Sequence, residues 1–558
     1  MRYRVLFAFA LAACACPASQ AEDSSFGTAC GTKLVVGCQP FHFTGANCHY
    51  LMTHAADEGS RSHADEVLAA AHSMGITCIR TWAFGEKGTW NVLQPSPGDY
   101  DYHVFEGLDY VLDRCGQLGI RGILTLVNSC DDYGGMQQYV DWDGGGAHDD
   151  FYTRPNCKEW YRNHVLKVLT RVNSVNGRTY KDDPTILAWE LANEARARTA
   201  GLAVLNAWMQ EMSGYIKSID SNHLVSSGIE GFYADAQKNP TPDMALNGTD
   251  FISTHQIPSI DIASGHSYPD RWDIDYATAM AFAQQMITDA HTVLGKPFIL
   301  GEFGRLRIRG DRDEYFQGYY GLVTQDRAAG SCAWMLADNS WGPYDDGFSV
   351  YYPGDAATVA IIAQNASDMQ ALAAAEGPSA AEIRDSGPGT LFCSSAPLVA
   401  SAVFPGEFYV QQEDRAAAIR VVSDSAPRAG DRVRVGGLVC DDSLGRCLQA
   451  RCWSIVSGGE PPRPLFVRNS SLCGTPPAGI GGPSSPGAYN GGLLVRVAGR
   501  VVSGDGFFAL DDGTGAPVRV TGGAAPAGSI ALVTGIAGYD ASGARSVRPR
   551  SEADIVLL

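Results

Sequence analysis

The chain has 558 residues, of which 45% are hydrophobic and 18% are charged, and its formal net charge is −19 with a pI near 5.0. Because this length exceeds what one hydrophobic core usually holds, we expect two or more globular domains. The negative charge argues against nucleic acid and anionic membrane surfaces as partners, since both would be repelled, and it leaves a neutral substrate unaffected.

The first residues have the layout of a secretory signal peptide. Arg2 and Arg4 precede the apolar stretch 5–15, and a run of small residues ends at Ala21 before two acidic residues. We therefore expect a signal peptide over residues 1–21 and a secreted, extracellular protein. The alternative is a lipoprotein anchor at Cys14, because the residues before it resemble the motif that precedes an acylated cysteine. No later segment approaches the roughly 20 apolar residues of a membrane span, so no transmembrane segment is expected.

Between residues 38 and 375, apolar strand-like runs alternate with helical patterns, as in βα units on a parallel sheet. The strands are predicted at 41–48, 77–82, 121–127, 186–191, 224–228, 261–265, 297–301 and 331–335. The helices are predicted at 64–74, 105–118, 159–175, 202–219, 276–294, 314–329 and 358–374. Eight such units predict a (β/α)8 TIM barrel as the catalytic domain, residues 22–375, with its active site at the carboxyl ends of the strands.

From about residue 376 the composition shifts to Gly, Pro, Ser, Val and Arg, and the long helical periodicity disappears. A motif then repeats without gaps, from Phe408-Tyr409-Val410 to Phe507-Phe508-Ala509 and from Ile419-Arg420-Val421 to Val518-Arg519-Val520. A constant offset predicts two copies of one small β module. We expect a linker at 376–398, the modules at 399–456 and 493–558, and a Gly/Pro/Ser-rich linker at 457–492 between them.

The two modules resemble the OB-like barrels that are appended to secreted bacterial enzymes. OB surfaces bind oligosaccharides or oligonucleotides. A structural spacer and a carbohydrate-binding module are both open interpretations of these modules, and nucleic-acid binding is the least favoured.

Fifteen cysteines, thirteen of them after Ala21, fit an oxidising compartment in which disulfides persist. Four of them lie close enough in the sequence to form two bridges of undetermined pairing: Cys440, Cys447, Cys452 and Cys473. A zinc site is the alternative, but this cluster has no Cys-x-x-Cys pair and no nearby histidine. The acidic loops lack the ligand spacing of a calcium loop, so no metal is expected.

Two apolar runs each end on a glutamate, Trp189–Glu194 and Phe298–Glu302. The strand predictions place Glu194 just beyond the fourth strand and Glu302 just beyond the seventh, so both should reach one mouth of the barrel. Cleavage of a glycosidic bond needs such a pair, with one carboxyl protonated to donate to the leaving oxygen and the other ionised. Glu190, two residues inside its strand, is expected to make a structural ion pair or hydrogen bond.

These two motifs resemble the acid/base and nucleophile motifs of glycoside hydrolase family 5, and the likeness covers most of residues 40–350. Within that family the chain is most similar to the plant- and fungal-type endo-β-1,4-mannanases (mannan endo-1,4-β-mannosidases). The further motifs that carry the likeness are Leu126-Val127-Asn128, Asp132–Gly135, Gln138–Val140, Phe151–Thr153, Asp182–Ile186, Ile257–Asp261 and Gly265–Pro269.

The resemblance implies a retaining double displacement in which Glu194 is the general acid/base and Glu302 the nucleophile. It implies that Asn193 hydrogen-bonds the 2-hydroxyl of the sugar, a contact that strengthens as charge develops. It also implies that Trp334, on the eighth strand, forms the floor of the subsite that holds the cleaved sugar, because an apolar ring suits the C–H face of a pyranose.

Six further residues are expected around this pair. At the end of the second strand, Arg80 points into the barrel mouth with its same-face neighbours, where its guanidinium could hold Glu302 ionised. The resemblance implies that two of the others support the glutamates and that the rest contact substrate in the cleft. The six residues are Arg80, Trp82, Asn128, Arg196, His266 and Tyr268.

Three features depart from the family's pattern. Ala195 stands where a proline is usual after the acid, Cys130 stands where tryptophan is frequent, and the loop 338–346 is unlike its usual counterpart. None of them alters the two carboxylates. The mechanism is therefore predicted more firmly than the preference among β-mannans.

The sequence thus predicts a secreted, monomeric endo-β-1,4-mannanase that needs no cofactor. Its substrate would be a β-mannan polysaccharide or oligosaccharide, from mannan, glucomannan or galactomannan. The first alternative is another family 5 β-glycanase or an exo-β-mannosidase. The second is a catalytically silent carbohydrate-binding protein, against which the retained Arg80, Asn193 and two glutamates count.

Overall fold

The computed structural model describes residues 26–88, 90–338, 346–375, 379–394, 396–442, 444–476, 484–504, 507–540 and 542–558. The chain divides into two compact units, Ser25–Gly377 and Pro378–Leu558. The expected signal peptide, Cys14 and residues 339–345 of the loop after Trp334 lie outside the described residues. Within the described ranges, no helix is both long enough and apolar enough to cross a membrane.

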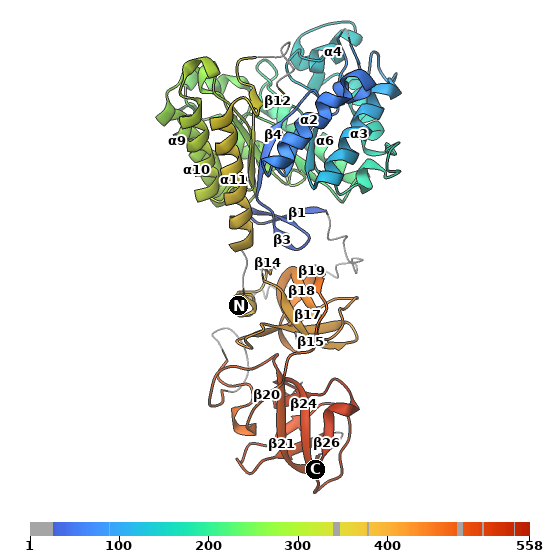
Figure 1. The fold of residues 1–558 in the computed structure, drawn as a ribbon, viewed down its shortest axis with the longest axis vertical. Coiled ribbons are helices and arrows are strands. Elements are labelled where there is room, and N and C mark those ends of the chain that lie inside the picture. Colours follow the sequence, from blue (N-terminus) through green and yellow to red (C-terminus); the bar gives the residue numbers. More distant parts are fainter. Residues whose placement is uncertain are drawn as a thin grey trace, which may run out of the picture. The chain divides into compact units, whose positions relative to one another are not determined.

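An eight-stranded parallel sheet forms the centre of the first unit, with helices on its outside (Figure 1). The strands follow the order β8-β7-β6-β5-β4-β11-β10-β9, and a parallel bridge between Ser226 and Ile262 joins its two ends. The bounds are β4 Phe43–Asn47, β5 Cys78–Trp82, β6 Arg121–Thr125, β7 Ile186–Glu190, β8 Leu224–Ser226, β9 Ala263–Ser267, β10 Phe298–Phe303 and β11 Gly330–Ala333. The predicted (β/α)8 barrel is confirmed.

Helix α3, Tyr102–Leu118, begins and ends at recognisable capping residues. The side chain of Asp101 accepts a hydrogen bond from the His103 N–H at the start of α3, and Gly119 ends this helix in the left-handed conformation. The long helices, all predicted, are α2 Glu58–Ser73, α3 Tyr102–Leu118, α5 Pro155–Leu169, α6 Leu202–Ile219, α9 Tyr276–Asp289, α10 Arg312–Gln325 and α11 Ala356–Ala375. The shorter α1 Leu51–Ala56, α4 Gly135–Trp142, α7 Phe251–His255 and α8 Pro269–Trp272 were not predicted.

A small antiparallel sheet precedes the barrel and packs against the amino ends of its strands. It consists of β1 Gly27–Cys30, β2 Lys33–Val36 and β3 Gln39–Pro40. Leu34 of this sheet belongs to the same buried cluster as Phe43, Leu187 and Leu224 inside the barrel. Because this end of the barrel is filled with apolar side chains, we look for the candidate active site at the opposite mouth. There, β12 Leu336–Asp338 and β13 Val350–Tyr352 follow β11.

The second unit contains two five-stranded barrels with one topology. In the first, β15-β16-β17-β19-β18 closes on itself, and in the second β21-β22-β23-β25-β24 closes in the same way, with one parallel pair at the equivalent place in each. The predicted pair of OB-like repeats is therefore confirmed. The bounds are β15 Leu398–Phe404, β16 Glu407–Gln411, β17 Ala418–Val422, β18 Arg432–Asp442, β19 Gly445–Ser457, β21 Leu494–Gly504, β22 Phe507–Asp511, β23 Val518–Val520, β24 Ile530–Tyr539 and β25 Arg545–Arg548.

Parts of the two expected linkers fold onto these barrels. Helix α12, Ala380–Asp385, buries Ile383 in the core of the first barrel, and β14, Leu391–Cys393, pairs with β18. In the second barrel, β20, Leu465–Phe466, runs parallel to β21, and β26, Ile555–Leu557, pairs with β24.

The expectation of two disulfides among Cys440, Cys447, Cys452 and Cys473 is wrong. Cys452 is disulfide-bonded, but the other three are free thiols. Cys440 and Cys447 face each other across the β18–β19 hairpin with their Sγ atoms 2.9 Å apart, whereas Cys473 is buried in the core of the second barrel. Closeness in sequence could not reveal that Cys473 belongs to a different module from the other three.

Candidate active site

Glu194 lies beyond the carboxyl end of β7 in an unusual backbone conformation. Its φ is 51°, in the left-handed region, which costs a non-glycine residue roughly 1–3 kcal/mol. Its N–H donates to the carbonyl of Gly228 over 2.8 Å. A Cβ on Gly228 would lie 2.0 Å from the Ala192 carbonyl oxygen, so only glycine permits this close approach. The local strain is concentrated at the residue expected to donate the proton.

Glu302 lies on β10 next to a β-bulge. Leu300 pairs with Gly265 of β9 and Glu302 pairs with His266, which leaves Gly301 as the extra residue. Bulges re-aim side chains and are frequent next to active sites. A Cβ on Gly301 would lie 3.2 Å from the Nε2 atom of His266, so this position favours glycine.

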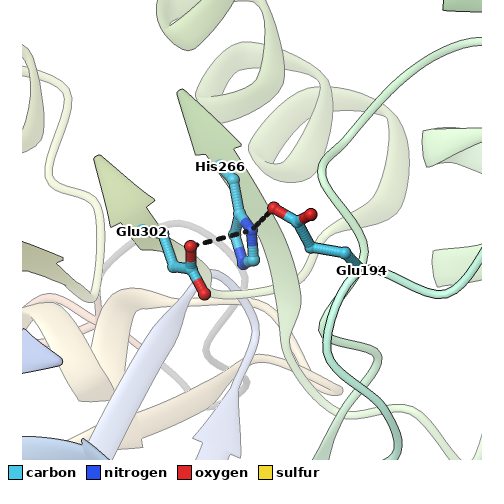
Figure 2. A group of neighbouring side chains, drawn as sticks. All are labelled: Glu194, His266 and Glu302. Carbon is cyan, nitrogen blue, oxygen red and sulfur yellow. Dashed lines mark hydrogen bonds and ion pairs between the residues drawn. The ribbon is translucent and has the colours of Figure 1, made fainter. Parts of the chain in front are cut away.

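The bulge and the turn after β7 bring both carboxylates to one histidine (Figure 2). His266 Nδ1 lies 2.9 Å from Glu194 Oε1 and 3.6 Å from Glu302 Oε2. One ligand atom from each of the three residues lies within 4.8 Å of the other two. One carboxyl oxygen of each glutamate thus lies within 4.8 Å of the other, which fits the about 5–5.5 Å separation of retaining glycosidases better than the about 6.5–9.5 Å of inverting enzymes.

Arg80, on β5, fixes the geometry beneath the carboxylates. This buried guanidinium donates from Nη1 to Glu302 Oε1 over 2.6 Å and from Nη2 to Glu190 Oε1 over 2.5 Å. It also donates to the side-chain oxygens of Asn47 and Asn193. Burial opposes its charge, but the two carboxylates more than offset this and raise the pKa of Arg80 above its usual value. Glu190 thus makes the ion pair expected of it.

The two candidate catalytic glutamates differ in how strongly their charge is compensated. Burial raises the pKa of both above the usual range. At Glu302, the Arg80 guanidinium and a 2.6 Å hydrogen bond from the Tyr268 hydroxyl oppose this effect. At Glu194 the nearest guanidinium, Arg196, stands 3.5 Å away. The arrangement favours an ionised Glu302 and a protonated Glu194.

Burial also lowers the pKa of His266, which keeps the imidazole neutral. Among the described residues its Nε2 has no hydrogen-bond partner, so we assign the proton to Nδ1, from which it is donated to Glu194. Together, Glu194, His266 and Glu302 could supply three ligands to a metal ion. Because the Arg80 guanidinium already lies 2.6 Å from Glu302, the group is better suited to proton transfer than to cation binding.

A cleft of about 550 Å³ opens over the two carboxylates. Trp334 forms part of its wall, and its Nε1 donates to Asp346 over 2.7 Å. His49 stacks on the Trp334 indole with ring centroids 5.2 Å apart and also contacts Trp82. These ring faces suit the C–H face of a pyranose.

All ten residues predicted for the site lie at this mouth of the barrel. Eight of them line the cleft, namely Trp82, Asn128, Asn193, Glu194, Arg196, Tyr268, Glu302 and Trp334. The other two, Arg80 and His266, are buried and contact the carboxylates from below. Cys130, which departs from the family's pattern, also lines the cleft.

Among the cleft residues that were not predicted, two are titratable groups close to the catalytic centre. Glu230 lies just beyond β8 and accepts two 2.5 Å hydrogen bonds from Arg196. Burial and the neighbouring Glu194 raise the pKa of Glu230 to about 7. The signal for it was the same as for the predicted pair, an acid just after an apolar strand. The second is His49, just beyond β4, where burial lowers the pKa to about 3.

The chain resembles known glycoside hydrolases. A family model described as GH family 5 beta-mannosidase-like matches residues 24–320. A mannan endo-1,4-beta-mannosidase 1 from Solanum lycopersicum is 42% identical over 356 residues, which cover 60% of this chain and 89% of that protein. Its counterpart from Oryza sativa is 38% identical over 379 residues, covering 63% and 87%. The crystal structure of an endo-1,4-beta-mannanase from Rhizomucor miehei matches 62% of this chain and 99% of its own, with 30% identity and a TM-score of 0.55.

Proposed function

The chain belongs to the β-mannosidase-like group of glycoside hydrolase family 5, and on this basis we propose that it is an endo-β-1,4-mannanase. Its reaction would be the hydrolysis of internal β-1,4-mannosidic bonds in mannan, glucomannan or galactomannan with retained anomeric configuration. The observation that supports this best is the pair of unequally compensated carboxylates within 4.8 Å at one cleft.

In the first step Glu194 donates its proton to the leaving glycosidic oxygen while the Glu302 carboxylate attacks the anomeric carbon. The C–O bond of the substrate breaks, and an ester bond between the sugar and Glu302 forms. Glu194, now ionised, then takes a proton from a water molecule that attacks the same carbon and releases Glu302. Together the two steps return Glu194 to its protonated state and Glu302 to its free carboxylate, so the pair is ready for another turnover.

Arg80 and Tyr268 position the nucleophile and keep it charged until attack. The hydrogen bonds from both groups to Glu302 are 2.6 Å long. Asn193 accepts from Arg80 through Oδ1 and donates to Asn128 through Nδ2, which orients its amide beside the two glutamates. We assign to this amide the contact with the 2-hydroxyl, and to Trp334 the floor beneath the cleaved sugar.

We also propose that the protein is secreted and acts as a monomer without a cofactor. The signal-peptide layout of residues 1–21 supports secretion, and the reaction requires only carboxylates, water and the fixed donors around them. The intact set of Arg80, Asn193 and both glutamates supports an active enzyme over a silent binding protein.

The test is a comparison of polysaccharides with purified wild-type protein and the Glu302→Gln variant as a blank. We expect reducing ends and a rapid fall in viscosity from β-mannan, and neither from carboxymethyl-cellulose. Cleavage of carboxymethyl-cellulose alone would identify another β-glycanase. Release of mannose without loss of viscosity would identify an exo-β-mannosidase.

A further inference from the structure

A second cavity, of about 430 Å³, lies where the two small barrels of the second unit meet. Its walls come from β16, β17 and β19 of the first barrel, from β24 and β25 of the second, from α12 and from the segment before β21. This volume is within the about 300–1,000 Å³ of small-molecule sites. The barrel mouth of the first unit contributes nothing to it.

The two barrels are joined at this cavity by buried contacts. The buried carboxylate of Glu407 accepts a 2.7 Å hydrogen bond from Arg420 of its own barrel and another from Arg548 of the second barrel. The Leu494 N–H donates to the Gln411 side chain over 3.1 Å. The Arg548 guanidinium also lies 3.7 Å from the centre of the Phe404 ring. These contacts fix several of the side chains that bound the cavity.

The charges that line the cavity are paired with carboxylates. Arg420 pairs with Asp442 as well as Glu407, Arg446 pairs with Asp441 over 2.5 Å, and Arg384 pairs with Asp385 over 2.6 Å. Arg420 is 5% exposed, and its Nε–H lacks a hydrogen-bond partner within the described part of the chain. Paired guanidinium groups offer N–H donors without a strong net field, which suits a neutral hydroxylated ligand better than an anion.

Aromatic rings complete the walls. Tyr409, Tyr489 and Tyr539 line the cavity, and all three are partly exposed. The Arg384 guanidinium stacks over the Tyr489 ring at 5.3 Å. Burial raises the pKa of Tyr409 and of Tyr489 to about 12, so both phenols keep their proton. A ring face beside fixed hydroxyl and N–H donors matches a pyranose, which has an apolar C–H face and a polar rim.

The repeat shows that the junction, rather than each barrel alone, creates this environment. Arg519 is the counterpart of Arg420 in the second barrel, and it likewise pairs with an aspartate, Asp540. Its side chain is 35% exposed and covers Phe507 at the barrel surface, whereas the Arg420 side chain is 6% exposed.

We propose that the junction cavity binds neutral hexose units of a polysaccharide, so that the second unit holds the enzyme on its polymer. This inference rests on the proposed function only where it names that polymer as β-mannan. A module that served only as a spacer would not require a cavity lined by three tyrosines and by a buried arginine whose Nε–H has no hydrogen-bond partner among the described residues.

The test is affinity electrophoresis of the full chain through gels that contain glucomannan, hydroxyethyl-cellulose or polygalacturonate, or no polymer. All proteins carry Glu302→Gln so that the polymer is not cut. Tyr489→Ala is compared with Phe466→Ala, which removes a ring that is 69% exposed on β20, outside the cavity. We expect Tyr489→Ala to weaken retention by glucomannan about fivefold to tenfold, Tyr489→Phe to retain most of it, and Phe466→Ala to change nothing.

Circular dichroism melting curves would show that each variant is folded. Adding Trp334→Ala to every protein weakens polymer binding at the catalytic cleft. In that background, Tyr489→Ala should still weaken retention by glucomannan. Equal retention of the Tyr489→Ala and Phe466→Ala proteins would overturn the proposal. Retention by polygalacturonate alone, or displacement by single-stranded DNA, would also overturn it, because either result would indicate an anion site. A failure of the mannanase proposal would appear separately, in the wild-type hydrolysis assay.

Discussion

The mouth of the large barrel and the junction of the two small ones both bury arginine–carboxylate networks, but they distribute charge differently. At the mouth, Arg80 compensates Glu190 and Glu302, while the charged group nearest to Glu194 is the Arg196 guanidinium, 3.5 Å away. At the junction, Glu407 and Asp442 together compensate Arg420. A network with one poorly compensated acid can move a proton, whereas one with matched charges can stabilise a fold or bind a ligand.

The backbone conformation also differs between the barrel mouth and the junction. Glu194 has a left-handed φ and Glu302 adjoins a bulge, whereas Arg420 and Glu407 lie in regular, paired strands. Strain is thus stored where the side-chain position decides the chemistry. Changes at the mouth should mainly alter rate, and changes at the junction should mainly alter stability or binding.

The largest effect is expected for Arg80→Lys, which should lower kcat about 10²–10³-fold. One ammonium group cannot serve Glu190, Glu302 and Asn193 together. The pKa of Glu302 should rise, so the acid limb of the pH–rate profile should move to higher pH, because the nucleophile must be ionised. Arg171→Lys is the matched control, since the Arg171 side chain, 8% exposed, also pairs with a buried carboxylate, that of Asp109, outside the cleft. Equal rate losses in the two variants would contradict the role of Arg80.

At the junction, Glu407→Gln should cost about 3 kcal/mol of unfolding free energy in the second unit, because Arg420 and Arg548 lose their shared carboxylate. Denaturant titration followed through the transition of that unit would measure this loss. Glu302→Gln should instead abolish activity and leave the second unit as stable as in the wild type. If the Glu407→Gln variant were as stable as the wild type, the proposed contrast between the two networks would be contradicted.

A smaller effect is expected for Gly301→Ala, which places a methyl group 3.2 Å from His266 Nε2 and 3.3 Å from its Cδ2. Displacement of this ring and of the bulge should lower kcat/KM about 10-fold to 100-fold. Gly321→Ala in α10 is the control, because its methyl group would meet only one atom, 4.0 Å away, and the helix should gain about 0.5–1 kcal/mol. Unchanged kinetics for Gly301→Ala would show that the bulge does not position the site.

The smallest effect is a shift in pH dependence for Glu230→Gln. Without the Glu230 charge, Arg196 is free to compensate Glu194, so the pKa of Glu194 should fall. Because Glu194 must be protonated to donate, the alkaline limb of the kcat/KM profile should move down by about one pH unit. A shift to higher pH would contradict the assignment of Glu194 as the acid.

Much of the site could be predicted, because an apolar strand that ends at an acidic residue can be recognised in the sequence itself. The eight strands and the positions of Glu194 and Glu302 follow from that pattern and from the geometry of a parallel barrel. Glu230 carries the same signal but lacks the motif around it. His49 has no local signal, since it matters only through its contact with Trp334 far along the chain.

Other features depend on tertiary contacts. The left-handed φ of Glu194 requires Gly228 from the next strand, and the bulge at Gly301 requires the His266 ring. The thiols of Cys440 and Cys447 are apposed by the register of a hairpin that the sequence does not specify. The junction cavity arises from the packing of two repeats, so neither repeat predicts it alone.

The most direct test of the division of labour between the two glutamates is azide rescue of Glu194→Gln on an aryl β-mannobioside with a good leaving group. Without its acid/base the enzyme still forms the sugar ester on Glu302, which azide can attack. We predict faster turnover with azide and a β-configured glycosyl azide by NMR, with no rescue of Glu302→Gln by the same route. An α-configured product from Glu194→Gln would contradict double displacement through Glu302.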